Sequence, residues 1–150
     1  MKLRSLLFVP ADNERKLAKS LGSAADVLIL DLEDAVAQAR KPLARAAAAE
    51  FIAAQAAKLQ ARLFVRINPL DSGLAMADLA AVVLPGLAGV MLPKTQSAAD
   101  TVRLGHGLEA VADAEGGDAG GEEPAVDLRG AFGVDAAGSA GQHDRGWILG

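Results

Sequence analysis

The sequence of 150 residues contains no cysteine and no tyrosine, and it has only one tryptophan. Without cysteine the chain can form no disulfide, no thiolate nucleophile and no cysteine-ligated zinc or iron–sulfur site. Any metal would therefore have to bind oxygen or imidazole ligands. The absence of cysteine fits a reducing compartment, and we expect a cytoplasmic protein.

An excess of positive charge is also absent, because 15 basic residues stand against 19 acidic ones and the formal net charge is −4. Such a chain has no surplus of cations to neutralise phosphates, which argues against nucleic acid and anionic membranes as partners. Long apolar runs are missing too. The longest uncharged run, residues 79–93, is interrupted by proline and glycine and is shorter than the roughly 20 residues that a membrane-spanning helix needs.

Hydrophobic residues make up 51% of the chain and the mean hydropathy is +0.24, so a core can form, although alanine contributes much of this fraction. The length allows one ordinary domain. The composition changes near residue 113. Residues 1–112 carry 13 basic residues, 11 acidic residues and 6 glycines, whereas residues 113–150 carry 2, 8 and 10. We therefore predict a folded domain over 1–112 and an irregular tail, rich in glycine and acidic residues, over 113–150.

Four apolar runs have the length of strands, and a helical pattern follows each of them. The runs are residues 6–9, 27–30, 63–67 and 90–92. The expected helices run from a cap at Asp12 to about 21, from Lys41-Pro42 to about 60, from Ser72-Gly73 to before Pro85, and from Ser97 or Asp100 towards His106. This repetition predicts an α/β fold of about four parallel βα units. Right-handed crossovers then bring the carboxyl ends of all strands to one edge of the sheet.

Three acidic residues, Asp31, Glu33 and Asp34, follow the second predicted strand. Such a cluster can hold Mg²⁺ directly or through water molecules, because this cation prefers oxygen ligands. Taken alone, the segment is interpreted equally well as a turn with helix-capping acids.

Arg66 ends the third predicted strand, where alternation would favour an apolar side chain. A guanidinium there must meet an anion to offset its desolvation, and its planar fork suits a carboxylate. The anion is either a bound ligand or an internal partner, Asp31 or Glu33, and the sequence leaves both open. Asn68 and Lys94 follow neighbouring strand ends at the same edge.

Other chemistry has little support in the sequence. His106 and His143 have no adjacent nucleophile and are expected on the surface. Nucleotide-dependent chemistry is disfavoured because no glycine-rich phosphate loop follows the first strand.

Four segments together resemble the citrate lyase β-subunit group of the HpcH/HpaI aldolase superfamily, over residues 3 to about 110. They are residues 4–13 (RSLLFVPADN), 29–36 (ILDLEDAV), 65–69 (VRINP) and 91–94 (MLPK). The resemblance implies a partial TIM (β/α)8 barrel and a Mg²⁺-dependent carbon–carbon lyase. Such an enzyme cleaves a 3-hydroxyacyl thioester such as citryl-, malyl- or citramalyl-CoA to an acetyl thioester and a 2-oxo acid.

The same resemblance implies roles for individual residues. Arg66 would bind the carboxylate of the 2-oxo acid, with Lys94 and Asn68 as further substrate contacts. Asp31, Glu33 and Asp34 would orient metal-bound water and Arg66 without touching the metal. The family's direct Mg²⁺ ligands, a glutamate and an aspartate on later strands, have no counterpart in this sequence.

A complete barrel needs about 250 residues, so we expect a truncated chain, or one read in another frame after about residue 112, with little or no lyase activity. Acyl-CoA or 2-oxo acids are the expected ligands. Open sheet edges predict a homo-oligomer. One alternative is a non-catalytic half-barrel that binds acyl-CoA or a full-length lyase subunit. A phosphoacceptor domain is disfavoured, because Pro10-Ala11 and Asn68-Pro69 occupy the places where it needs acidic residues.

Overall fold

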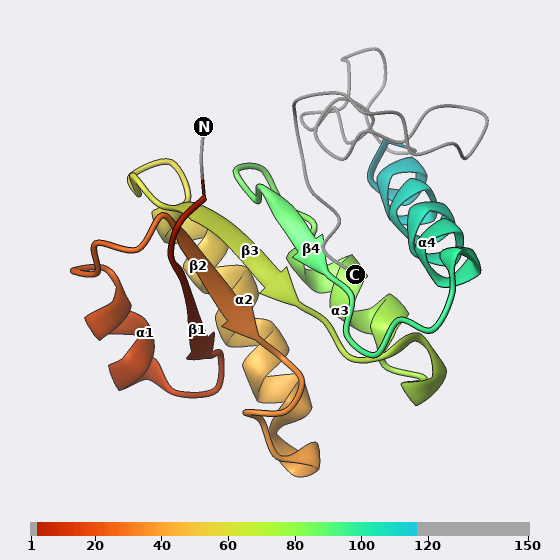
Figure 1. Cartoon of the computed structure of the whole chain (residues 1–150), viewed down its shortest axis with the longest axis horizontal. Helices are drawn as coiled ribbons and strands as arrows, with labels where there is room; N and C mark the ends of the chain where they lie inside the picture. Colours follow the sequence, from red (N-terminus) through yellow and green to blue (C-terminus); the bar gives the residue numbers. More distant parts are fainter. Residues whose placement is uncertain (1–2, 117–150) are drawn as a thin grey trace.

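Four parallel strands form one sheet in the computed structural model, which describes residues 3–116 (Figure 1). The strands lie side by side in chain order, as predicted from the alternation of apolar runs and helices. The elements are β1 (Leu6–Pro10), α1 (Glu14–Ser20), β2 (Val27–Asp31), η1 (Gln38–Arg40), α2 (Lys41–Gln55), β3 (Arg62–Arg66), η2 (Leu70–Ser72), α3 (Ala75–Val82), β4 (Gly89–Met91) and α4 (Ala98–Gly116).

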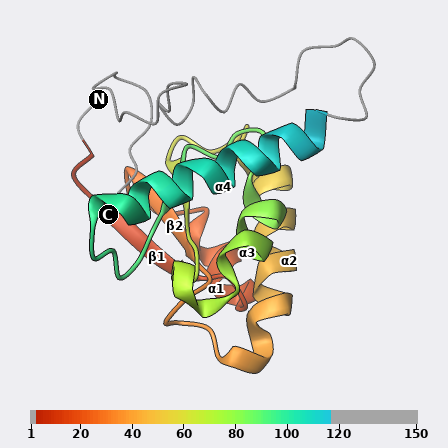
Figure 2. The ribbon, with the colours of Figure 1, turned by 90° about the vertical axis from the view of Figure 1, so that its right-hand side faces the viewer.

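One face of the sheet packs against the helices. Alternate strand residues such as Leu30, Val65 and Val90 point to this face and are fully buried. Helix residues such as Ile52 and Leu79 complete the same aliphatic core. Figure 2 shows α2, α3 and α4 following one another along the sheet, with α3 in contact with both of the others.

The opposite face carries a smaller apolar cluster formed by Val27, Ile29 and Phe64. The Phe64 ring packs so closely against Gly89 that a Cβ placed on this glycine would clash with Cε1 of the ring. The register aligns Ile29, Phe64 and Gly89 across three strands. Further along the same face, the same alternation places Asp31 beside Arg66.

The beginning of α1 differs from the prediction. Asn13 is the N-cap, with its side chain accepting a hydrogen bond from the Lys16 backbone N–H at 3.0 Å. Asp12 does not cap the helix. Instead it accepts a hydrogen bond from Arg40 Nε at 2.5 Å, which ties the loop after β1 to η1.

Two helix ends also differ from the prediction. Helix α2 ends at Gln55 rather than near residue 60, because the chain must turn back to enter β3 at Arg62. Helix α4 runs towards His106 as predicted and extends beyond it to Gly116, since Leu108 and Val111 continue its buried face. It therefore passes residue 112, and the remainder of the predicted tail, 117–150, lies outside the described residues. Within residues 3–116 no helix is both long and apolar enough to cross a bilayer.

Candidate carboxylate-binding site

Asp31 and Arg66 form a two-point ion pair at the carboxyl ends of β2 and β3. Arg66 Nε donates to Oδ1 of Asp31 at 2.9 Å and Nη2 donates to Oδ2 at 2.6 Å. The strand register makes the two residues direct neighbours. The internal partner proposed from the sequence is thus present, and a guanidinium fork bound to one carboxylate has a fixed direction.

Asp31 is 1% exposed and is further held by the backbone N–H groups of Glu33 and Ala35. Burial raises the pKa of Asp31, but the hydrogen bonds from Arg66 and from these two N–H groups outweigh it and hold the pKa below the ordinary value of 3.8. The pKa of Arg66 is raised, chiefly by its hydrogen bonds with Asp31. Both groups are therefore charged at neutral pH.

Glu33 lies between two cations. Its Oε2 is 3.3 Å from Arg66 Nη1 and its Oε1 is 2.8 Å from Lys94 Nζ. The contact with Lys94 is an ion pair rather than a well-directed hydrogen bond, and the Glu33 carboxylate raises the pKa of Lys94. Asp34 is exposed and lies 3.9 Å from both cations. Three carboxylates against two cations leave this cluster with one excess negative charge.

Lys94 reaches Glu33 from an unusual backbone conformation. Its φ is +55°, and among residues 3–116 it is the only residue other than glycine with a positive φ. An L-residue in this region costs roughly 1–2 kcal/mol. The ion pair with Glu33 contributes to holding it there, so the loop after β4 is tied to the loop after β2.

Lys41 was missed as a site residue, because the sequence indicated only a helix start at this position. Its buried ammonium donates to the carbonyl oxygens of Leu32 at 2.7 Å and Glu33 at 2.6 Å. The first residue of α2 thereby fixes the backbone that presents Glu33. Nothing in the local sequence distinguishes this lysine from a solvated one.

Asn68 does not join the cluster. Its side-chain amide and its backbone N–H both donate to Oδ2 of Asp78, at 2.7 and 2.8 Å. Arg45 donates to the other oxygen of this buried carboxylate at 2.9 Å. Asp78 was also missed, although an aspartate within the apolar α3 is a signal for a buried polar contact. The structure thus brings together Asp31, Glu33, Asp34, Arg66 and Lys94, and it places Asn68 beside α3 instead.

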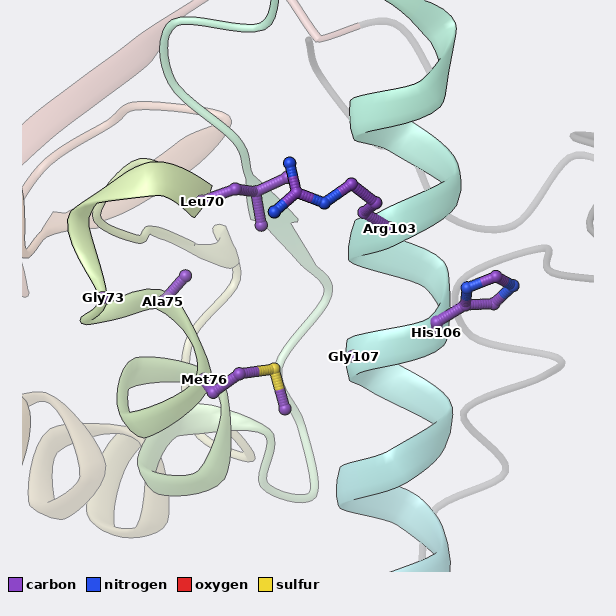
Figure 3. Close-up of a pocket in the computed structure, with 7 residues that line it drawn as sticks. All are labelled: Leu70, Gly73, Ala75, Met76, Arg103, His106 and Gly107. Atoms are coloured by element: carbon purple, nitrogen blue, oxygen red, sulfur yellow. The ribbon is translucent and has the colours of Figure 1, made fainter.

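Two cavities lie beyond Lys94. One, of about 490 Å³, is lined by the loops after β3 and β4 and extends from Lys94 to Arg103. The other, of about 370 Å³, lies between α3 and α4. Arg103 extends across it towards Leu70, whereas the exposed His106 ring points away (Figure 3). The predicted surface position of His106 is confirmed, and His143 lies outside the described residues.

The cluster does not by itself fit a magnesium ion. Both oxygens of Asp31 are occupied by Arg66 and backbone N–H groups. Glu33 faces two cations, so Asp34 is the one carboxylate that is largely exposed to solvent. Within residues 3–116 there is no group of three or more acidic or histidine side chains placed to hold a metal.

Four parallel strands, with an arginine held by carboxylates at their carboxyl edge, have the arrangement of part of an α/β barrel. The TIM barrel predicted from the sequence is a fold of this class. The chain belongs to the HpcH/HpaI aldolase/citrate lyase family, whose model matches residues 4–138. The fold and the family predicted from the sequence are both confirmed.

Known proteins of this kind are similar to the chain over part of their length. It is 37% identical to the citrate lyase subunit beta of Haemophilus influenzae, covering 91% of this chain and 47% of that protein. It is 39% identical to a (3S)-malyl-CoA thioesterase of Cereibacter sphaeroides, covering 73% of this chain and 35% of that protein. The chain therefore spans less than half the length of these two relatives.

Solved structures from Mycobacterium tuberculosis are also similar to this chain over part of their length. One, in complex with magnesium, acetoacetate and coenzyme A, has 42% identity and a TM-score of 0.54, covering 66% of this chain and 35% of that one. Another, of the citrate lyase beta subunit with oxaloacetate and magnesium, has 43% identity and a TM-score of 0.54, covering 66% and 42%. Magnesium is thus present in structures of close relatives.

Proposed function

We propose that this chain supplies the carboxylate-binding part of a carbon–carbon lyase of the citrate lyase beta and malyl-CoA lyase type. The whole enzyme would cleave citryl-, malyl- or citramalyl-CoA to an acetyl thioester and a 2-oxo acid. We further propose Mg²⁺ as the cofactor of the whole enzyme, with its direct ligands outside residues 3–116. The 150-residue chain alone would have little or no activity.

The observation that carries this proposal is the fixed guanidinium of Arg66. Asp31 accepts hydrogen bonds from Nε–H and from one N–H of Nη2, and Glu33 lies beside Nη1. One N–H on each Nη then remains for a ligand. A hydrogen bond between such a cation and a carboxylate contributes about 1.5–3 kcal/mol.

The reaction explains why a held arginine is useful. Cleavage breaks the bond between the hydroxyl-bearing carbon and the carbon next to the thioester. The hydroxyl loses its proton as the new carbonyl group forms, and the electron pair of the broken bond passes to the thioester as an enolate that is then protonated. The carboxylate beside the new carbonyl group keeps its charge throughout, so Arg66 can hold this group still while the bond breaks.

Charge balance also supports the need for a further cation. The cluster carries one excess negative charge before any substrate arrives, and an anionic substrate increases it. A metal ion beside the cluster would offset this charge and strengthen the binding of a 2-oxo acid. We assign Asp31, Glu33 and Asp34 to orienting Arg66 and metal-bound water, and Lys94 to contact with the substrate.

Two measurements on the purified chain test the proposal. Acetyl-CoA release from citryl-, malyl- and citramalyl-CoA, with and without Mg²⁺, should not exceed the uncatalysed rate. Oxaloacetate titrated calorimetrically with Mg²⁺ present should bind, and Arg66→Lys should weaken this binding by about tenfold or more because the fork is lost. Arg103→Lys is the matched control and should bind like the wild type.

Either of two results would contradict the proposal. Equal oxaloacetate affinity in wild type and Arg66→Lys would remove Arg66 from ligand binding. Mg²⁺-dependent release of acetyl-CoA by the 150-residue chain would show that this chain is active by itself.

A second candidate function is a non-catalytic half-barrel that binds acyl-CoA, a full-length lyase subunit or another copy of itself. The observation that favours it is β1, an outer strand whose Leu6, Leu7 and Phe8 are all more than a third exposed. Exposed apolar edge strands pair readily with other chains. Light scattering after size-exclusion chromatography, with and without a full-length lyase, tests this. A monomer that binds neither the lyase nor acyl-CoA would exclude it.

A further inference from the structure

Phe8 is an exposed aromatic residue on β1, and nothing in the site described above uses it. Its side chain is 44% exposed, although phenylalanine is among the residue types most often buried. It lies beside Ile29 of β2 in the strand register. Alternation therefore places the ring on the same face of the sheet as Asp31 and Arg66.

The guanidinium of Arg66 lies over this ring, with its Cζ 4.8 Å from the ring centroid. Arg66 is on β3 and Phe8 is on β1, and β2 lies between these strands. The arginine side chain thus reaches across β2, meets Asp31 there, and ends against β1. A cation within about 6 Å of a ring centroid is attracted by the ring's electrons.

The ring and the carboxylates restrict different motions of the guanidinium. Asp31 and Glu33 contact its N–H groups and so hold it by its edge. An aromatic ring beneath the flat group resists tilting of its plane. Together the two restraints favour one direction for the remaining N–H groups.

We propose that Phe8 is a positioning residue that fixes the plane of the Arg66 guanidinium for binding the carboxylate of a 2-oxo acid. This inference rests on the proposed function. Phe8 remains partly exposed because β1 has no neighbouring strand on its outer side among the described residues, although Arg66 lies over the ring.

Replacement of Phe8 should leave the fold intact. The β1 residue that belongs to the main core is Val9, which is 3% exposed. Leu6 lies on the same face as Phe8, two residues earlier, and is exposed to nearly the same extent, 43%. It provides a matched control for the loss of exposed apolar surface on this strand.

The first measurement is the NMR resonance of the Arg66 side-chain Nε–Hε group in the full 150-residue chain, without ligand. The ring current of Phe8 should shift this resonance. Phe8→Leu should remove the shift, Phe8→Tyr should retain it, and Leu6→Ala should leave it unchanged. This readout does not depend on any substrate.

The second measurement is the oxaloacetate dissociation constant with Mg²⁺ present. Phe8→Leu should weaken binding by about two- to fivefold, with Phe8→Tyr restored to the wild-type value and Leu6→Ala unaffected. An Arg66 resonance that is the same in wild type and Phe8→Leu would overturn the proposal, as would equal losses in Phe8→Leu and Leu6→Ala. If the wild type binds no oxaloacetate, the proposed function fails, while the Arg66 resonance still decides whether Phe8 fixes the guanidinium.

Discussion

The two faces of the sheet use the same four strands for different purposes. On the helix-covered face, Leu28, Leu30, Leu63 and Val65 are buried in one aliphatic core. On the other face, Ile29 and Phe64 are apolar, but the next positions along the strands are Asp31 and Arg66. One face therefore packs in the core throughout its length. The other face is apolar in its middle and carries charged side chains at the carboxyl ends of the strands.

This difference shows how a strand of five residues can serve both purposes. Successive side chains point to opposite faces, so a charged residue at the strand end does not interrupt the core behind it. The cost of burying Asp31 is offset locally by Arg66 and two backbone N–H groups. The predictions that follow test this contrast between packing and pairing.

The largest effect is expected on the charged side. Arg66→Met leaves the Asp31 carboxylate buried without its partner, which should lower the free energy of unfolding by about 3–5 kcal/mol. Urea denaturation measures this. The double variant Asp31→Leu/Arg66→Met should recover most of the loss. A loss below 1 kcal/mol in the single variant would mean that the pair is not buried.

On the helix-covered face, substitutions should change the stability of the fold through packing alone. Leu30 is fully buried, so Leu30→Ala should cost about 2–5 kcal/mol through lost burial and the cavity that remains. Leu7 points to the same face from the outer strand and is 38% exposed. Leu7→Ala is therefore the control, and an equal loss in both variants would contradict the assigned burial.

Gly89 tests the apolar part of the opposite face. Gly89→Ala places a Cβ against the Phe64 ring and should destabilise the protein by about 1–3 kcal/mol. At Gly22 the nearest atom to an added Cβ is 3.9 Å away, so Gly22→Ala should have little effect. Thermal unfolding of the two variants side by side is sufficient. Equal midpoints would show that β4 does not approach Phe64 so closely.

The smallest effect concerns the cap of α1, at the same end of the sheet as the charged cluster. Asn13→Ala removes the acceptor for the Lys16 backbone N–H and should cost about 1 kcal/mol. Asn13→Ser should retain most of the stability. If Asn13→Ala unfolds at the wild-type urea concentration, the helix is capped elsewhere.

Much of the fold could be predicted because its signals are local. Apolar runs such as 27–30 and 63–67 define buried strands, and the helices between them require parallel strands. The meeting of Asp31 and Arg66 follows, since both end neighbouring strands. The resemblance of four short segments to one family then indicated the family, which spacing alone could not.

The remaining features depend on contacts between distant residues. Asn68 lies two residues beyond Arg66, the last residue of β3, but its side-chain amide donates to the buried Asp78 on α3 instead of joining the cluster. Lys41 gains its role because two carbonyl groups lie in front of it only after folding. The helix that was predicted to run towards His106 extends well beyond it because Leu108 and Val111 occupy buried positions.

The central claim is that β2 and β3 hold Asp31 and Arg66 together at the buried edge of the sheet. It is tested most directly by the pKa of Asp31, measured by NMR titration of its side-chain carboxyl carbon. A pKa below the ordinary 3.8 means that the pair stabilises the folded state fully above pH 3.8, and that this contribution is lost as the pH falls through the lower, folded-state value. We predict such a value for the wild type and a higher one for Arg66→Lys. A wild-type pKa at or above 3.8 that Arg66→Lys does not change would contradict the pairing on which the proposed site depends.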